Sequence, residues 1–416
     1  MIHCNSLGKW PIPLIVAICF VGDPLSAFAQ RYQLEIIAQP GDVIDGRTIT
    51  RFSPEDNPIA INNNRQVAFL ASVDGPSNWS IMTPDRFIAG AGKVVDGVVP
   101  YFANEDHRFS INDAGEVAYK GLLNNGAGTF FGGGAIFIDD TMVVGIGDVI
   151  EDRTITSVDF GPAINDEGTI AFVATYSENV GPGLFTQDKV VAEFGQSFDG
   201  ITIGLMFRPV INDAGTIAFS GGIVGRNRFG IFTDGGLLVQ PAESAPNGTL
   251  QTPHDVIDGR KLGGDLVPIT INDAGEVAFS SVLIPFTGDV GIFTQNRLIV
   301  ETGAIIDGKR ILDFAGGTQF NNVGALAFFA RFAGGVGLFS DNSFVLGTGD
   351  SVDERVITSF RPWLAINDRG DLAFLANFDD GTAGIVLATV PEPSTVMLLS
   401  FTLAFAVPRR SRLRSI

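Results

Sequence analysis

The sequence predicts an all-β protein, a seven-bladed β-propeller, and three observations support this fold class. One phrase, INDAGEVAY from Ile111 to Tyr119, recurs seven times along the chain, and its asparagines lie 46 to 60 residues apart. Short runs of Val, Ile and Phe, separated by Gly, Asn and Asp, accompany every copy, as expected of β-strands. One such run precedes the first copy and is missing after the last. The seven asparagines are Asn62, Asn112, Asn165, Asn212, Asn272, Asn321 and Asn367.

A period near 50 residues indicates an array of supersecondary units, each too small to bury its own apolar faces. In the fifth unit, strands are predicted to end at Ile271, to run through Val277–Phe279 and Gly291–Phe293, and to include Leu298–Glu301. About four strands per unit of this length is the blade of a β-propeller. An alanine at the centre of the second strand is constant, and we expect it to let neighbouring blades approach closely, with aromatic residues filling the space. These alanines are Ala68, Ala118, Ala171, Ala218, Ala278, Ala327 and Ala373.

The phrase contains an Asn-Asp-x-Gly turn between the first two strands of each unit. We expect Asn and Asp to accept backbone hydrogen bonds locally, and Gly to supply the positive φ of a type I turn with a bulge. Glycine occupies that position in six copies, and Arg65 replaces it in the first.

The displaced run at Leu34–Asp42 predicts how the chain closes. The N-terminal strand is expected to complete the last blade, with Glu35–Gln39 beside Ala383–Thr389, so that the ring has no open edge. A β-solenoid or tandem β-sandwiches are the alternatives. A solenoid favours polar caps at both ends, and none is evident.

Both ends of the chain are predicted to be targeting signals. Residues 1–29 carry Lys9, an apolar stretch and the sequence Ala27-Phe28-Ala29, which predicts a secretory signal peptide cleaved after Ala29. Cys19 could indicate a lipoprotein, but bulky Ile18 precedes it, so we disfavour a lipid anchor. The domain boundaries are therefore 1–29 for the signal peptide, 30–390 for the propeller and 391–416 for a C-terminal tail.

The tail begins with Pro391, Glu392 and Pro393, continues with an apolar stretch from Val396 to Val407, and ends in four arginines. This order resembles the PEP-CTERM sorting signal of Gram-negative bacteria. The resemblance implies export, transient retention at the inner membrane, processing by an exosortase near the Pro-Glu-Pro motif, and an association with exopolysaccharide and biofilm. The arginines would stay on the cytoplasmic side while the apolar segment arrests translocation, which agrees with retention at the inner membrane. The apolar stretch is short for a transmembrane span, which favours transient retention over permanent membrane anchoring.

Composition limits the classes of partner. The net charge is −19, which disfavours nucleic acid and anionic membranes as partners. The only cysteines, Cys4 and Cys19, lie in the predicted signal peptide, so the exported protein is expected to have no disulfides.

An acid recurs in the connector ahead of each copy of the phrase, and a ring would place these carboxylates in a circle. Calcium capture, with bridging to an acidic polysaccharide, is one interpretation, because hard cations take oxygen ligands. We favour a two-residue hairpin turn instead, because Asp-Gly is a preferred hairpin loop. The acids are Asp45, Asp96, Glu151, Asp199, Asp258, Asp307 and Asp353.

Catalytic signals are sparse, and we assign no catalytic, cofactor-binding or metal-binding residue. His107 and His254 lack metal-ligand spacing, and the sequence has neither a G-x-S-x-G elbow nor a P-loop. The phrase slightly resembles the Asp-box of sialidase propellers, without its Ser and Trp. Arg108, Arg208 and Arg361 lie just ahead of three copies and could bind a carboxylate together.

These observations predict an exported, non-enzymatic matrix or cell-surface protein that binds exopolysaccharide or a protein partner. A carbohydrate-active propeller enzyme, of glycosidase or lyase type, is the alternative. The longest interval between asparagines contains an insertion at residues 241–253, which is expected to form a loop on one face.

Overall fold

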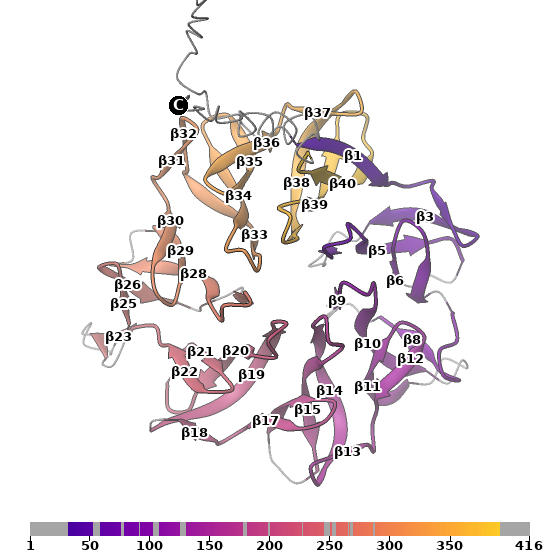
Figure 1. The fold of residues 1–416 in the computed structure, drawn as a ribbon, viewed down its shortest axis with the longest axis vertical. Coiled ribbons are helices and arrows are strands. Elements are labelled where there is room, and N and C mark those ends of the chain that lie inside the picture. Colours follow the sequence, from indigo (N-terminus) through magenta and orange to yellow (C-terminus); the bar gives the residue numbers. More distant parts are fainter. Residues whose placement is uncertain are drawn as a thin grey trace, which may run out of the picture.

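The computed structural model describes residues 32–391, except 53–58, 76–78, 91, 103–107, 125–129, 178–180, 199, 227, 245–249, 252–254, 265, 267–268 and 286–287. These residues form seven small antiparallel sheets arranged as blades around a central channel (Figure 1). The predicted seven-bladed β-propeller is confirmed. The described part of the chain contains no helix with the length and apolar character that a membrane span requires.

The third blade shows the repeating unit in its complete form. Its strands are adjacent in sequence order and run antiparallel, and β14 is the innermost of the long strands (Figure 1). The four long strands match the prediction, and a two-residue strand, β13, adds a short hairpin before them. The strands are β13 (Val149–Ile150), β14 (Arg153–Ile164), β15 (Ile170–Tyr176), β16 (Pro182–Thr186) and β17 (Val190–Glu193).

The other blades repeat this plan, with the inner strand interrupted in the first, second, fifth and sixth. Blade 1 contains β2 (Val43–Ile44), β3 (Arg47–Phe52), β4 (Ile59–Ile61), β5 (Val67–Val73), β6 (Trp79–Met82) and β7 (Phe87–Gly90). Blade 2 contains β8 (Val99–Tyr101), β9 (Phe109–Ile111), β10 (Val117–Asn124), β11 (Phe130–Ile138) and β12 (Thr141–Val144). Blade 4 contains β18 (Ser197–Phe198), β19 (Ile201–Ile211), β20 (Ile217–Ile223), β21 (Phe229–Thr233) and β22 (Gly236–Val239).

The insertion between blades 4 and 5 forms a separate hairpin of β23 (Glu243–Ser244) and β24 (Leu250–Gln251). Blade 5 contains β25 (Val256–Ile257), β26 (Arg260–Gly263), β27 (Ile269–Ile271), β28 (Val277–Ile284), β29 (Val290–Thr294) and β30 (Leu298–Glu301). Blade 6 contains β31 (Ile305–Ile306), β32 (Lys309–Arg310), β33 (Asp313–Phe320), β34 (Leu326–Phe332), β35 (Gly335–Ser340) and β36 (Ser343–Gly347). Blade 7 contains β37 (Ser351–Val352), β38 (Arg355–Ile366), β39 (Leu372–Phe378) and β40 (Ala383–Thr389).

The N-terminal strand closes the ring. Strand β1 (Gln33–Ala38) pairs antiparallel with β40, with Leu34 opposite Ala388 and Ile36 opposite Val386. The predicted closure is confirmed, and the first strand of the chain is the outer strand of the last blade. The backbone groups along β40 are thereby paired rather than left at an open edge.

The blades pack through the constant alanines, all of which are at most 1% exposed. Ala118 of blade 2 lies in one core cluster with Phe172 and Phe185 of blade 3. Those two rings stack across β15 and β16 with centroids 5.8 Å apart. The predicted close approach is therefore confirmed, because a methyl group on one blade contacts an aromatic pair on the next.

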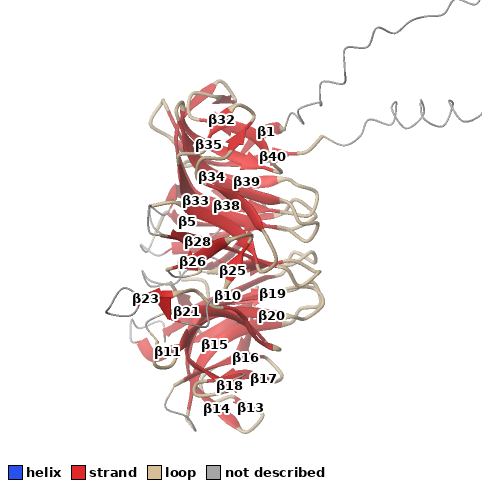
Figure 2. Ribbon diagram, turned by 90° about the vertical axis from the view of Figure 1, so that its left-hand side faces the viewer, coloured by secondary structure: helices blue, strands red, loops and turns tan. Residues whose placement is uncertain are grey.

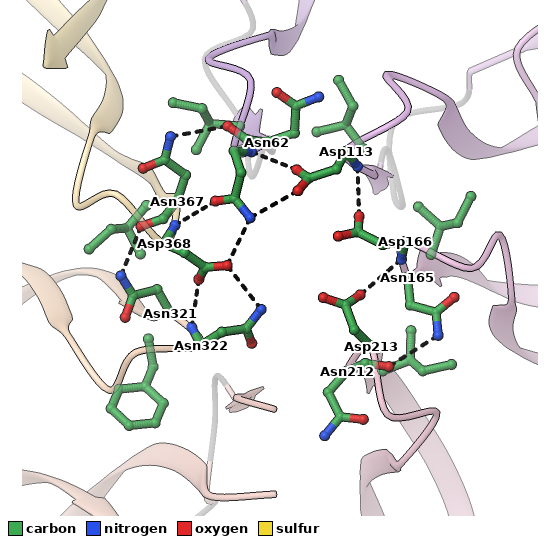
Figure 3. Close-up of a pocket in the computed structure, with 17 residues that line it drawn as sticks. Asn62, Asp113, Asn165, Asp166, Asn212, Asp213, Asn321, Asn322, Asn367 and Asp368 are labelled. Atoms are coloured by element: carbon green, nitrogen blue, oxygen red, sulfur yellow. Dashed lines mark hydrogen bonds between the residues drawn. The ribbon is translucent and has the colours of Figure 1, made fainter. Parts of the chain in front are cut away.

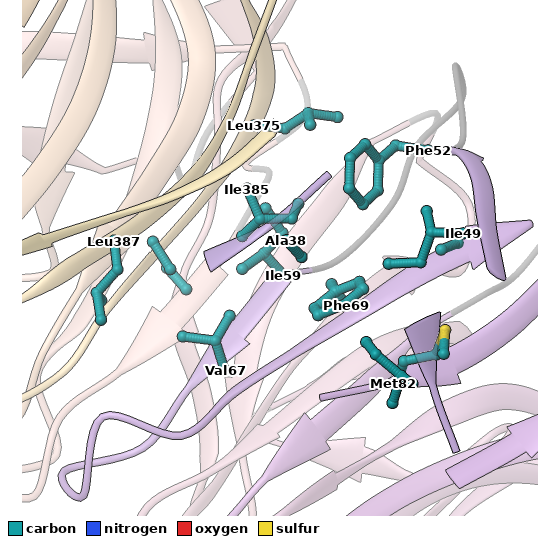
Figure 4. Close-up of a cluster of buried hydrophobic side chains, with 14 of the residues drawn as sticks. Ala38, Ile49, Phe52, Ile59, Val67, Phe69, Met82, Leu375, Ile385 and Leu387 are labelled. Atoms are coloured by element: carbon teal, nitrogen blue, oxygen red, sulfur yellow. The ribbon is translucent and has the colours of Figure 1, made fainter. Parts of the chain in front are cut away.

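The same kind of core joins the last blade to the first. Phe69 of β5 and Val67 lie against Leu375 and Ile385 of blade 7, and Ala38 of β1 joins them (Figure 4). The closure is thus a continuous apolar interface as well as a pair of hydrogen-bonded strands. Burial of this surface supplies the main non-directional stabilisation of the junction.

Candidate functional site

The Asn-Asp-x-Gly turns have the predicted geometry. In the second copy, the Gly115 amide donates to the carbonyl of Asn112 at 2.9 Å, and Gly115 has φ of +81°. The Asn112 side chain accepts locally, since its Oδ1 lies 2.9 Å from the Glu116 amide. Arg65, at the glycine position of the first copy, adopts the same region with φ of +63°.

The asparagine side chains also link the blades, which the sequence pattern did not indicate. Six of the seven Nδ2 groups donate to the main-chain carbonyl of the asparagine in the next blade, and the chain of bonds passes through the closure (Figure 3). All seven asparagines are at most 4% exposed. The links are Asn62 to Asn112 (2.9 Å), Asn112 to Asn165 (3.4 Å), Asn165 to Asn212 (3.1 Å), Asn212 to Asn272 (2.9 Å), Asn321 to Asn367 (2.8 Å) and Asn367 to Asn62 (3.1 Å).

The residues that follow these asparagines form a second ladder, and here the prediction of local capping by Asp was wrong. In five of the six bonds a carboxylate accepts from the main-chain amide of the equivalent residue in the preceding blade, and in the sixth the side-chain oxygen of Asn63 accepts from the Asp368 amide. The local backbone groups of the turn are already paired with the Asn, so the Asp is directed across to its neighbour. The bonds run from Asn63 to Asp113 (2.7 Å), Asp113 to Asp166 (2.6 Å), Asp166 to Asp213 (2.9 Å), Asp213 to Asp273 (3.0 Å), Asn322 to Asp368 (2.8 Å) and Asp368 to Asn63 (2.7 Å).

These turns surround a cavity of about 170 Å³ at one mouth of the channel. Side-chain amides and carboxylates surround it (Figure 3). The described residues that line it are Ile61, Asn62, Asn63, Ile111, Asp113, Ile164, Asn165, Asp166, Ile211, Asn212, Asp213, Phe320, Asn321, Asn322, Ile366, Asn367 and Asp368.

Charge is unevenly distributed around this rim. The side-chain Nδ2 of Asn63 donates to Asp113 at 3.0 Å and to Asp368 at 2.8 Å, so those two carboxylates share a neutral donor. Asp166, in contrast, lies between two other acids. Burial raises the pKa of Asp166 to about 6, and the charges of Asp213 and Asp113 act in the same direction, against the lowering effect of the Asp113 amide. Burial likewise raises the pKa of Asp273.

The chain closure adds an ion pair at the same face. Arg65 Nε lies 2.8 Å from Asp371 Oδ2, and the Asp371 side chain is fully buried. Asp371 also accepts from Asn367 Nδ2 at 3.1 Å and from the Val390 amide at 2.8 Å. In the sequence, this contact was indicated only by Arg65, which stands where the other six copies of the phrase have glycine.

The connector acids occupy hairpin turns, as the favoured interpretation predicted. Asp45 and Gly46 have φ of +48° and +74°, the type I′ pattern of a two-residue loop. The carboxylate of Asp45 accepts from the amide of Phe87, at the start of the outer strand of the same blade, at 2.7 Å. Asp199 lies outside the described residues. The equivalent bonds join Asp96 to Met142, Glu151 to Val190, Asp258 to Leu298, Asp307 to Phe344 and Asp353 to Ile36.

None of the other candidate residues that the structure describes lines this cavity. Arg108, Arg208 and Arg361 are absent from the described walls of the cavity. Within the described ranges, no group of three or more His, Cys, Asp or Glu side chains is arranged to hold a metal ion. His107, His254, the cleavage position Ala29, and Glu392 and Pro393 of the tail lie outside the described residues. Pro391 is described and exposed.

Comparisons with known proteins leave the activity open. A family model described as "Family of unknown function (DUF7453)" matches residues 88–397. None of the curated proteins matches the chain.

Three solved structures illustrate the likeness. A gluconolactonase from Xanthomonas campestris is 11% identical with a TM-score of 0.32, covering 88% of this chain and 93% of its own. A subtype N10 neuraminidase-like protein of A/little yellow-shouldered bat/Guatemala/060/2010 is 8% identical with a TM-score of 0.33, covering 86% of this chain and 99% of its own. A glucose dehydrogenase is 10% identical with a TM-score of 0.30, covering 86% and 100%. Likeness at this level carries no conclusion about activity.

Proposed function

We propose that this chain, which belongs to the DUF7453 family of unknown function, is an exported, non-enzymatic binding platform. It acts at the cell surface or in the extracellular matrix, where the rigid disc is held through its C-terminal tail. The face opposite the tail binds an exopolysaccharide or a protein partner. An exosortase-type enzyme at the inner membrane processes the tail.

The observation that carries this proposal is the position of the chain ends. Val390 is held at the Asn-turn face, where Asp371 accepts from its amide and Arg65 Nη2 donates to its carbonyl at 3.4 Å. Tyr32 lies beside Asp341 and Asp371, which raise its pKa in addition to the larger effect of burial. Both ends therefore leave from the face that carries the Asn turns. A chain tethered after Val390 holds that face toward its anchor.

The opposite face is then free for a partner. In an antiparallel blade, the loops between the second and third strands lie at the other end from the Asn turns, together with the connectors to the next blade. The insertion with β23 and β24 follows β22, the outer strand of blade 4, and so belongs to this free face. In the edge-on view of the disc, β23 lies at the left-hand side (Figure 2). Insertions in one blade are common carriers of binding residues.

The chemistry of the channel mouth supports binding rather than turnover. The asparagines and aspartates there are engaged in hydrogen bonds that join the blades, such as Asn165 to Asn212 and Asp166 to Asp213. A glycosidase or lyase needs carboxylates placed about a scissile bond. The carboxylates of this rim instead hold main-chain amides.

The test is a glycan array probed with the exported form, with and without calcium, followed by a turnover assay on each hit. In one variant, residues 243–253 are replaced by a short Gly-Ser linker, which keeps the base of the insertion, where Gln240 bonds Asp255 at 2.6 Å. The control is Val323→Ser, which changes a side chain 71% exposed on the Asn-turn face. Retention should be lost in the first variant and kept in the second. Product release from any retained glycan would replace this proposal with the carbohydrate-active alternative.

Export and sorting need a separate measurement. Mass spectrometry of the protein from cell and medium fractions should show loss of residues 1–29 and, after sorting, of the arginine tail. An intact C-terminus in the medium would contradict processing.

A further inference from the structure

The two ladders around the channel are interrupted at the same place. Among the described residues, no hydrogen bond joins Asn272 to Asn321, although six equivalent links join the other neighbours. The second ladder likewise has six bonds and none from the Asp273 amide to Asn322. Asn272 Nδ2 is directed instead to Glu276 of its own turn, at 3.3 Å. Both interruptions lie between blades 5 and 6.

The lining of the cavity is asymmetric at the same place. Its walls include residues from the turns of blades 1, 2, 3, 4, 6 and 7, whereas Asn272 and Asp273 of blade 5 are not among them. Blade 5 therefore stands back from the channel mouth relative to its six equivalents. The rim of the cavity is incomplete beside blade 6.

The sequence offers a physical cause. The phrase begins with isoleucine in six copies and with Phe320 in the sixth. Phe320 is 5% exposed and belongs to the core cluster between blades 5 and 6, together with Ala278 and Ile292 of blade 5. A phenyl ring is bulkier than the isoleucine side chain, and a close-packed interface transmits the added volume to the turns above it.

We propose that the seam between blades 5 and 6, held apart by Phe320, is the place where the ring opens most readily. The termini are not the weak point of this disc, because the join of blades 7 and 1 has both ladder bonds and the Arg65–Asp371 pair. Movement of blade 5 against blade 6 breaks no ladder bond, whereas opening at any other seam breaks two.

Hydrogen exchange of the exported protein, resolved to single amides, tests this proposal. The Asp273 amide should exchange at least about tenfold faster than the ladder amides of Asn63, Asp166 and Asp368, since a hydrogen bond protects each of those. Equal protection of all of them would overturn the proposal. So would earlier loss of protection at Asp368, on the terminal join.

The cause is tested by Phe320→Ile, which restores the residue of the other six copies. Exchange at Asp273 should slow toward the rate of the other ladder amides. The matched control is Phe314→Ile, which removes a similar volume from the same cluster at the far end of β33. Unchanged exchange in the first variant, or equal slowing in both, would overturn the assignment of Phe320 as the wedge. Circular dichroism and a urea titration show whether each variant is folded.

Discussion

Arg65 and Asp371, 306 residues apart in sequence, form an ion pair with Nε 2.8 Å from Oδ2 across the junction of the first and last blades. Arg65 takes the left-handed backbone conformation that glycine takes in the other six turns. The pair also holds the backbone of Val390, where the chain leaves the ring.

Arg65→Met should lower the free energy of unfolding by about 2–4 kcal/mol, because it leaves the fully buried Asp371 carboxylate without its cation. Asp371→Asn should cost less, since the amide oxygen still accepts from Val390. Urea titration of both single variants and the double variant gives the coupling energy. Arg310→Met, which removes an exposed cation from blade 6, is the control and should be near neutral. If the losses of unfolding free energy in the two single variants add up to the loss in the double variant, Arg65 and Asp371 do not stabilise each other, and the prediction is wrong.

Asp166→Asn should stabilise the protein at neutral pH. The pKa of Asp166 is raised from 3.8 to about 6, so between these values the folded protein binds more protons there than the unfolded chain does. Its contribution to the free energy of unfolding therefore falls as pH rises through this window. Asparagine fits the position, since Asn63 and Asn322 occupy it in two other blades.

The measurement is urea unfolding of wild type and Asp166→Asn from pH 3 to 8. The variant should be the more stable above about pH 6, and the difference should vanish below about pH 4. Glu167→Gln removes the neighbouring exposed charge as a control. A difference that does not change with pH would contradict the shifted carboxylate.

Asn165→Ala should destabilise more than Asn272→Ala. The side chain of Asn165 donates to the next blade. The side chain of Asn272 bonds only to Glu276 of its own turn among the described residues, and its main-chain carbonyl accepts from Asn212. The difference in the free energy of unfolding should be about 1 kcal/mol, the net value of one buried hydrogen bond. Equal losses in urea titrations would mean that the links between blades add nothing to the turn bonds.

Asp307→Gly should cost about 1 kcal/mol by removing the cap on the Phe344 amide, while preserving the turn. Asp307→Ala should cost more, because its backbone has φ of +48°. Thermal unfolding with and without calcium checks both points. Stabilisation of wild type by calcium that is lost in Asp307→Gly would favour cation capture over the turn interpretation.

The targeting signals and the partner remain predictions of the sequence alone. The tail resembles a PEP-CTERM signal through residues that lie outside the described part of the chain, apart from Pro391. The structure adds one fact to that prediction: Val390, the residue before the tail, is bound to Asp371 at the face of the Asn turns.

The repeat by itself determined the fold. A phrase that recurs at blade length, with constant alanines such as Ala118 and a displaced first strand, favours stacked blades joined at the chain ends over a solenoid or tandem sandwiches, because no unit buries its faces alone. Turn chemistry was equally local, so the φ of Gly115 and the type I′ loop at Asp45 and Gly46 followed from residue type.

Contacts between blades were decided only by the tertiary structure. Whether Asp166 accepts from its own turn or from Asp113 depends on the distance between blades, which no local pattern encodes. The pairing of Arg65 with Asp371 and the absence of ladder bonds between the described turns of blades 5 and 6 arise in the same way. Each depends on how side chains far apart in the sequence share the space around one channel, and packing settles that only after the ring has closed.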